Sequence, residues 1–278
     1  MSESSVIVES AVFWSATTAY AISSLAFFIW FAFRRSSAST FGLVVAAVGL
    51  VPHTAAIVLR WLDVGHGPFS SRYEVLSANA WLTVAVVVAL SLTVRRLAGL
   101  GVVAMPAAFL LMGWAVSAFG VRQEVPIIFK SAWLWLHIGF AKLFFVFALL
   151  AAASAIAWFV KNRAPERFEM LQDPRRLDLY GHQFLLVSFL CLGVMIVAGS
   201  LWAHESWGRY WGWDPIETAA LATWIAYGII LHMRVLHRWD GRRMAWLNLA
   251  AFALAVITLY VVVLVLPTVH DFYMVGGG

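Results

Sequence analysis

A tryptophan-rich segment, residues 202–217, is the part of this sequence best suited to chemistry. It reads WAHESWGRYWGWDPIE and lies between two long apolar runs. Its aromatic residues fall within twelve positions, interleaved with Gly208 and Gly212: Trp202, Trp207, Tyr210, Trp211 and Trp213. They could form an aromatic belt at a membrane surface, or an exposed surface for a large planar ligand that the glycines let the backbone approach. Their density favours the ligand surface.

The end of the same segment carries the signals of a helix start. Asp214 suits the N-cap position, Pro215 suits the first helical position, and Glu217 can reach back to the N-cap backbone as in a capping box. Asp214 therefore has a structural interpretation beside a possible role in ligand binding. The sequence leaves both open.

Two histidines flank the segment at the same depth if the apolar runs are membrane spans. His137 lies just inside the start of one span, after Trp133 and Trp135, and His270 follows the last span. A neutral imidazole is a common axial ligand of haem iron. The arrangement is typical of a bis-histidine haem site, although His137 could also be part of an interfacial aromatic belt.

Three further histidines are candidate haem-binding residues. His53 lies inside a span, where an ionisable side chain suggests function, although a hydrogen bond to a neighbouring helix explains it equally well. His66 lies in the loop 62–74, where it could simply be solvated. His232 would lie roughly 24 Å below the outer surface and His53 only ~10 Å below it. These two cannot bind one iron, so His232 would need a second ligand from elsewhere.

Transmembrane helices must position these residues. Of 278 residues, 63% are hydrophobic and 12% charged, which predicts an all-α integral membrane protein. We expect eight spans and a single transmembrane domain over residues 1–278, with the segment 202–217 outside the membrane between the sixth and seventh spans. The expected spans are residues 11–33, 41–61, 75–94, 97–119, 131–160, 183–203, 216–236 and 246–266.

The net charge of +5 follows this topology rather than a nucleic-acid partner. Most of the 19 Lys and Arg fall in every second connection: Arg34, Arg35, Arg95, Arg96, Lys161, Arg163, Arg167, Arg175, Arg176, Arg234, Arg238, Arg242 and Arg243. By the positive-inside rule these face the cytoplasm, so both termini and the tryptophan-rich segment are expected outside. The first ten residues carry no basic residue, so the first helix is expected to be retained.

The one cysteine, Cys191, lies in an apolar run. The sequence contains no CxxC motif, no zinc-site spacing, no catalytic triad and no paired acids. Any thiol chemistry must therefore belong to a partner.

The motif WGRYWGWDPIET resembles the tryptophan-rich WWD signature of the haem-handling proteins of cytochrome c maturation, a group that includes CcsA (ResC), CcmC and CcmF. A second block, similar to G-H-x-P-x-S-x-x-Y-E of the CcsA type, is matched by Gly65, His66, Pro68, Ser70, Tyr73 and Glu74. The resemblance covers roughly residues 50 to 272. It favours the CcsA type, since CcmC-like proteins have about six helices and CcmF-like proteins are far longer.

This resemblance implies that haem b is bound as substrate by His137, His270 and the segment from Trp207 to Asp214, on the extracytoplasmic side of the cytoplasmic (inner) membrane. It implies that His232 is an intramembrane ligand completed by a ResB (CcsB)-type membrane subunit. Haem would then pass outward and be presented to an apocytochrome c carrying CxxCH, whose thiols, kept reduced by a thioredoxin-like partner, add to the haem vinyl groups.

Two residues depart from the family pattern. His204 stands where Asn is frequent, which adds a possible ligand, and Ile216 stands where Lys is frequent, which removes a possible propionate contact. Arg209 is the candidate that pairs with the haem propionate instead. Two other functions remain open: a haem-binding scaffold or sensor without ligation activity, and a haem-free small-molecule transporter, for which the sequence shows neither internal repeats nor broken helices.

Overall fold

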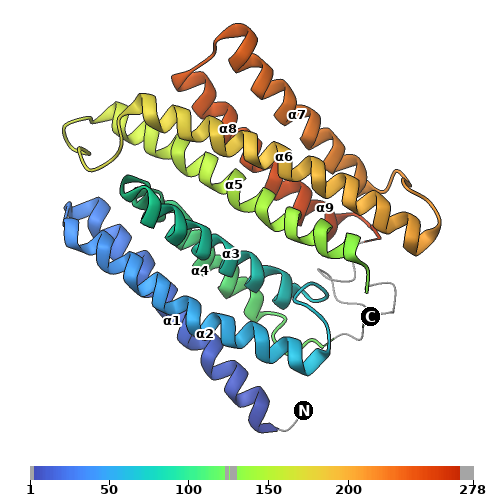
Figure 1. Ribbon diagram of the computed structural model, residues 1–278. Coiled ribbons are helices and arrows are strands. Elements are labelled where there is room, and N and C mark those ends of the chain that lie inside the picture. Colours follow the sequence, from blue (N-terminus) through green and yellow to red (C-terminus); the bar gives the residue numbers. More distant parts are fainter. Residues whose placement is uncertain (1–2, 123–124, 126–129, 270–278) are drawn as a thin grey trace. The chain divides into compact units, whose positions relative to one another are not determined.

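A computed structural model describes residues 3–122, 125 and 130–269 of the chain, which are helical and connecting segments without a strand. It has eight helices long and apolar enough to cross a membrane, so the predicted all-α, eight-span membrane fold is confirmed (Figure 1). The chain divides into two compact units, residues 1–124 with 164–172 (unit 1) and residues 125–163 with 173–278 (unit 2). The expectation of one transmembrane domain stays a prediction.

Unit 1 contains the first four spans. Its helices are α1 (Glu3–Phe33), α2 (Ser36–Val64), α3 (Arg72–Thr93), the short 3₁₀ helix η1 (Arg95–Leu100) and α4 (Gly101–Val116). α1 packs against α2 and α4, and α3 packs against α2 and α4. The segment 164–172 joins this unit through stacking of Phe168 on Phe31, at a centroid distance of 4.9 Å.

Unit 2 contains the last four spans. Its helices are α5 (Ala132–Arg163), α6 (Pro174–Trp207), α7 (Pro215–His237) and α8 (Gly241–Val256). A π-helical turn at Ile257–Val261 continues α8 into the short α9 (Val262–Val265), so these form one span. α5 packs along α6 and α8, and α7 packs against α6 and α8.

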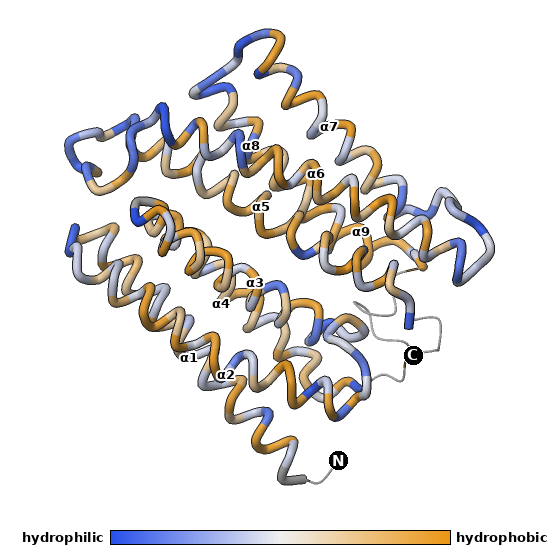
Figure 2. The backbone as a smooth tube through the Cα atoms, viewed as in Figure 1, coloured by the Kyte–Doolittle hydropathy of each residue, from blue (hydrophilic) through white to orange (hydrophobic). Residues whose placement is uncertain are grey.

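Most spans are longer than the apolar runs, because polar end turns continue the helices. α6 begins nine residues earlier than expected, since Asp173 caps its first turn by accepting a hydrogen bond from the Arg176 N–H at 3.0 Å. The fourth span differs in type at its start, where η1 precedes α4. Figure 2 shows hydrophobic residues along the helices and hydrophilic residues gathered at many of the helix ends and connections.

Large apolar side chains lie exposed on the outer faces of these helices. Val51, Leu92 and Leu110 are 71%, 75% and 69% exposed, and each lies in a span. A water-soluble chain rarely exposes so many apolar side chains on its helices. Lipid is the surrounding that these faces require.

Candidate functional site

The tryptophan-rich segment is the end of α6, a seven-residue connection and the start of α7. α6 ends at Trp207, and Gly208 reverses the chain with φ of 70°, its N–H donating to the His204 carbonyl at 2.9 Å. Trp213 also has positive φ, 57°, which is uncommon for a residue with a side chain. Its side chain is 71% exposed.

Two carboxylates hold this connection. Glu217 accepts hydrogen bonds from the N–H groups of Gly212 at 2.8 Å and Asp214 at 3.2 Å. Asp214 accepts from the Ile216 N–H at 3.0 Å. The predicted capping box at the start of α7 is therefore confirmed.

The second oxygen of Asp214 reaches the end of the last span. It accepts a hydrogen bond from the Val269 N–H at 3.0 Å. His270, the next residue, lies outside the described residues. The backbone that leads into His270 is therefore bonded directly to the tryptophan-rich segment.

The aromatic rings of the segment form perpendicular and stacked pairs rather than one flat surface. The Trp202 and Trp207 ring centroids lie 5.0 Å apart at 67°, and those of Trp211 and Trp213 lie 5.8 Å apart at 86°. Tyr210 stacks on His204, with ring centroids 4.1 Å apart and an interplanar angle of 7°. Trp202 is buried, whereas the other side chains are partly or largely exposed: Trp207, Tyr210, Trp211 and Trp213.

The segment also contains an arginine and two buried polar atoms without a hydrogen-bond partner among the described residues. The Arg209 side chain is exposed and its guanidinium lies against Gly212, where a Cβ added to the glycine would be 2.7 Å from the guanidinium carbon. Trp211 Nε1 and Ser206 Oγ are buried and have no hydrogen-bond partner among the described residues. An indole N–H only donates, so the partner that Trp211 lacks is an acceptor.

His137 lies on α5 with its ring against α6. Its Nδ1 is 2.8 Å from the Met195 carbonyl oxygen, and because a carbonyl only accepts, Nδ1 carries the proton. The lone pair is then on Nε2. Metal-bound histidines have this arrangement, in which one ring nitrogen donates a hydrogen bond and the other binds the metal. Gly199 makes this approach possible, since a Cβ there would lie 2.6 Å from His137 Nδ1.

His232 is exposed on α7. Its Nδ1 donates to the Gly228 carbonyl one turn earlier at 2.8 Å, which again leaves the lone pair on Nε2. Exposed apolar residues continue the same face at helical spacing: Ile225, Ile229 and Leu236.

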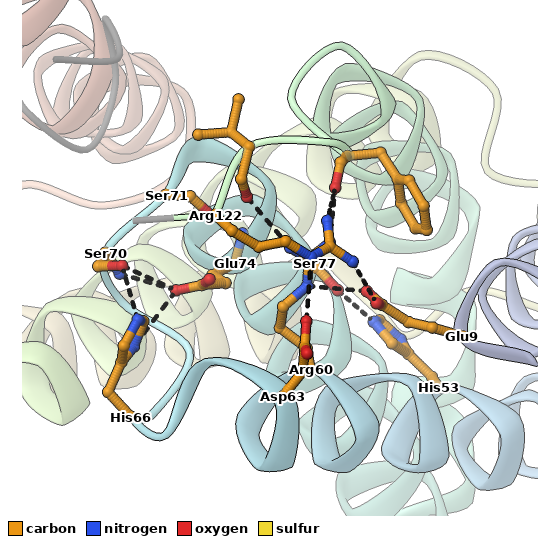
Figure 3. Close-up of polar contacts among 12 residues, drawn as sticks. Glu9, His53, Arg60, Asp63, His66, Ser70, Ser71, Glu74, Ser77 and Arg122 are labelled. Carbon is orange, nitrogen blue, oxygen red and sulfur yellow. Dashed lines mark hydrogen bonds and ion pairs between the residues drawn. The ribbon is translucent and has the colours of Figure 1, made fainter. Parts of the chain in front are cut away.

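His53 and His66 lie in unit 1 and are both buried. Figure 3 shows their polar contacts. His53 uses both ring nitrogens within the protein, Nδ1 with the Tyr20 hydroxyl and Nε2 with the Ser77 hydroxyl, each at 2.9 Å. These bonds join α1, α2 and α3. They favour the structural interpretation of His53.

His66 is not solvated. Its Nδ1 donates to the Gly67 carbonyl at 2.8 Å, and its Nε2 lies 3.2 Å from the Ser70 hydroxyl. The Glu74 carboxylate accepts from the Ser70 N–H at 2.9 Å and lies 3.8 Å from His66 (Figure 3). The G-H-x-P-x-S-x-x-Y-E block thus folds into a turn held by hydrogen bonds at the start of α3, where Ser71 is the N-cap.

Sequence reasoning missed a buried ion network in unit 1. Glu9 of α1 binds Arg60 at 2.8 Å and Arg122 at 2.9 Å, and Arg122 also binds Asp63 at 3.0 Å (Figure 3). The side chains of Glu9 and Arg60 are each 1% exposed. The available signal was Glu9, an acid that begins a long apolar stretch of α1, since arginines near helix ends are ordinary.

Fold and site together describe a multi-pass membrane protein with a tryptophan-rich connection between its sixth and seventh spans. Residues 69–270 match the family described as Cytochrome C assembly protein, and the chain belongs to this family.

Proteins named "Cytochrome c biogenesis protein CcsA" are similar to this chain. That of Synechococcus sp. (strain CC9605) is 30% identical over 250 residues, 78% of this chain and 81% of the relative. That of Chlorella vulgaris is 27% identical over 249 residues, 76% of this chain and 79% of the relative.

A solved structure, "Cytochrome c Heme Lyase CcmF", shares the fold with a TM-score of 0.69 at 15% identity. The match covers 91% of this chain but only 46% of that one, so the chain spans less than half of its length.

Proposed function

We propose that this protein binds haem b as a substrate at the tryptophan-rich segment and presents it for covalent attachment to the CxxCH motif of apocytochrome c. The single observation that carries the proposal is the hydrogen bond between Asp214 and Val269, which joins the segment to the chain just before His270. Family membership and the CcsA relatives, named for cytochrome c biogenesis, support it.

The residues of unit 2 suit this substrate. His137 and His270 are the axial ligands, and the His137 tautomer, with its proton on Nδ1, has its lone pair on Nε2, the atom that would bind iron. The exposed rings of Trp207, Tyr210 and Trp213 and the partly exposed ring of Trp211 contact the macrocycle. Arg209 pairs with a propionate, and Asp214 holds the segment in shape.

The protein itself contributes binding and orientation. The bound haem supplies vinyl groups to the apocytochrome thiols, which a thioredoxin-like partner keeps reduced. Positioning these groups can lower the barrier substantially without a protein nucleophile.

His232 supports a second site, shared with a ResB (CcsB)-type subunit. An ionisable side chain exposed to lipid is costly, so a partner helix is the better surrounding for it. The apolar stripe of Ile225, Ile229 and Leu236 suits such a helix. Haem would pass from His232 to the tryptophan-rich segment.

The membrane is the cytoplasmic (inner) membrane, with the tryptophan-rich segment and both termini on the extracytoplasmic side. The positive-inside rule supports this orientation, because α5 and α7 both carry basic residues in their last turns.

Cytochrome formation tests the proposal. The chain is expressed with a ResB-type partner and an apocytochrome in a host without its own maturation system, and covalent haem is measured by haem staining. We expect His137→Gly and His270→Gly to reduce the product strongly. The matched control, His237→Gly at the opposite end of α7, should leave it unchanged.

The same assay separates the other functions. A haem-binding scaffold or sensor would retain haem while the pair forms no cytochrome. A haem-free transporter would purify without haem. The histidine substitutions at positions 137, 270 and 237 would then change neither its haem content nor the amount of cytochrome formed.

A further inference from the structure

A second polar site lies at the other end of unit 2, where α5 and α7 end and α6 and α8 begin. Arg234 of α7 binds Asp178 of α6, with NH2 2.7 Å from the carboxylate. The other oxygen of Asp178 accepts from the Gly241 N–H at the start of α8, at 3.1 Å. His182 follows Asp178 by four residues on α6, so the two side chains lie on the same face of the helix. We call Asp178, His182 and Arg234 the Arg234 cluster.

Two nitrogens of this cluster are buried and unsatisfied. Arg234 NH1 and His182 Nδ1 have no hydrogen-bond partner within the described part of the chain. A guanidinium only donates, so the partner that Arg234 lacks is an acceptor, and an imidazole nitrogen that carries its proton needs one as well. Since buried polar groups are normally bonded, the pair indicates a ligand with acceptor oxygens.

The charges around the cluster favour an anion. Six exposed arginines of unit 2 lie in the end turns of the helices at this end or directly after them: Arg163, Arg175, Arg176, Arg238, Arg242 and Arg243. The exposed acids of unit 2 at this end are Asp173 and Asp240. The resulting positive potential concentrates anions next to the two unsatisfied nitrogens.

The position of the cluster favours a lipid headgroup as the source of the anion. Arg243 lies over the Trp239 ring at 5.3 Å, and Trp246 is 57% exposed on α8. Tryptophan and arginine at helix ends mark the headgroup level of a bilayer. Basic clusters between helices at this level suit acidic lipid headgroups, whose phosphate oxygens match a guanidinium.

We propose that Arg234 and His182 bind the phosphate of an anionic phospholipid, with Asp178 holding the Arg234 guanidinium in place. The site does not depend on the haem proposal. Arg234 is two positions from His232, which places their Cα–Cβ directions roughly 160° apart around α7. A haem carboxylate offers the same oxygen chemistry and is distinguished by experiment.

Lipid binding by the full-length protein tests the site. Delipidated protein is titrated with phosphatidylglycerol, and with phosphatidylcholine as the uncharged comparison, and bound lipid is counted by native mass spectrometry. Arg234→Gln is combined with Asp178→Asn, so that no buried carboxylate is left unpaired. We expect about tenfold weaker phosphatidylglycerol binding, the effect of losing a charged hydrogen bond.

The matched control is Arg238→Gln, an exposed arginine at the same end of α7. Its expected loss is within about twofold, because exposed charges are screened. Equal losses in both variants, or equal binding of both lipids to the wild type, would overturn the proposal. If the double variant does not fold, His182→Ala is used in its place. It is compared with Arg238→Gln, and the two lipids are compared on the wild type, as before.

Haem is added in a separate arm. If haem displaces phosphatidylglycerol from the wild type, the cluster is a haem carboxylate site and the lipid proposal is wrong. Unchanged lipid binding in saturating haem supports the phospholipid.

Discussion

Gly199 leaves the space that the His137 ring occupies, because a side chain at position 199 would overlap the imidazole. A Cβ would lie 2.6 Å from Nδ1 and 2.9 Å from Cε1 of His137. We therefore predict that Gly199→Ala displaces the ring, breaks the bond to Met195 and lowers the haem bound per protein several-fold, although alanine favours a helix by about 1 kcal/mol.

The measurement is the pyridine haemochrome assay on purified protein. Gly139→Ala is the control, since Gly139 lies on α5 two residues from His137 and its added Cβ would meet no atom within 4 Å. Equal haem in the two variants would contradict this role of Gly199.

Asp214 couples the cap of α7 to the chain before His270. Asp214→Ala removes both bonds, so we predict a loss of about 1 kcal/mol in stability from the cap together with weaker haem ligation. Asp173→Ala removes the cap of α6 at the other end of unit 2 and should cost similar stability while retaining haem. Thermal unfolding and haem content, measured on both variants, separate the two effects. An Asp214→Ala protein with normal haem content would show that the link to Val269 is unimportant for the site.

At the scale of elements, Glu9 holds α1 to α2 and to the chain that follows α4. We predict that Glu9→Gln destabilises the protein by about 3–5 kcal/mol, because it leaves the buried Arg60 uncompensated and removes one partner of Arg122. The free energy of unfolding in mixed micelles, from denaturant titration, measures this.

The comparison is the exposed pair of Asp173 and Arg176, whose side chains are 55% and 61% exposed. Asp173→Asn should cost at most about 1 kcal/mol. Similar losses for Glu9→Gln and Asp173→Asn would mean that the buried network contributes no more than a surface pair.

The spans and the start of α7 could be predicted from sequence because their signals are local. Apolar length defines a span, and Asp214, Pro215 and Glu217 lie within four positions. The network of Glu9 and Arg122 and the contact of Gly199 with His137 could not, because each joins residues far apart in the sequence. For His53, the sequence identified a polar group within a span but not the Tyr20 and Ser77 hydroxyls that bond to it.

At the scale of the whole molecule, the proposed orientation can be tested by cysteine labelling. In a Cys191→Ser background, Ser117→Cys lies after α4 and Ser36→Cys lies at the start of α2, both exposed. We predict that a membrane-impermeant maleimide labels the Ser117→Cys protein in intact spheroplasts, and the Ser36→Cys protein only after lysis. The reverse pattern would place the tryptophan-rich segment in the cytoplasm.

The visible spectrum and haem stoichiometry of the protein, purified with its partner subunit, test the central claim most directly. Wild type, His137→Gly and His270→Gly are compared with and without added imidazole. We predict a low-spin, six-coordinate haem in the wild type, weakened by each substitution and restored by imidazole, which replaces the missing ligand. Absent haem, or a haem spectrum indifferent to both substitutions, would contradict a bis-histidine site at the tryptophan-rich segment.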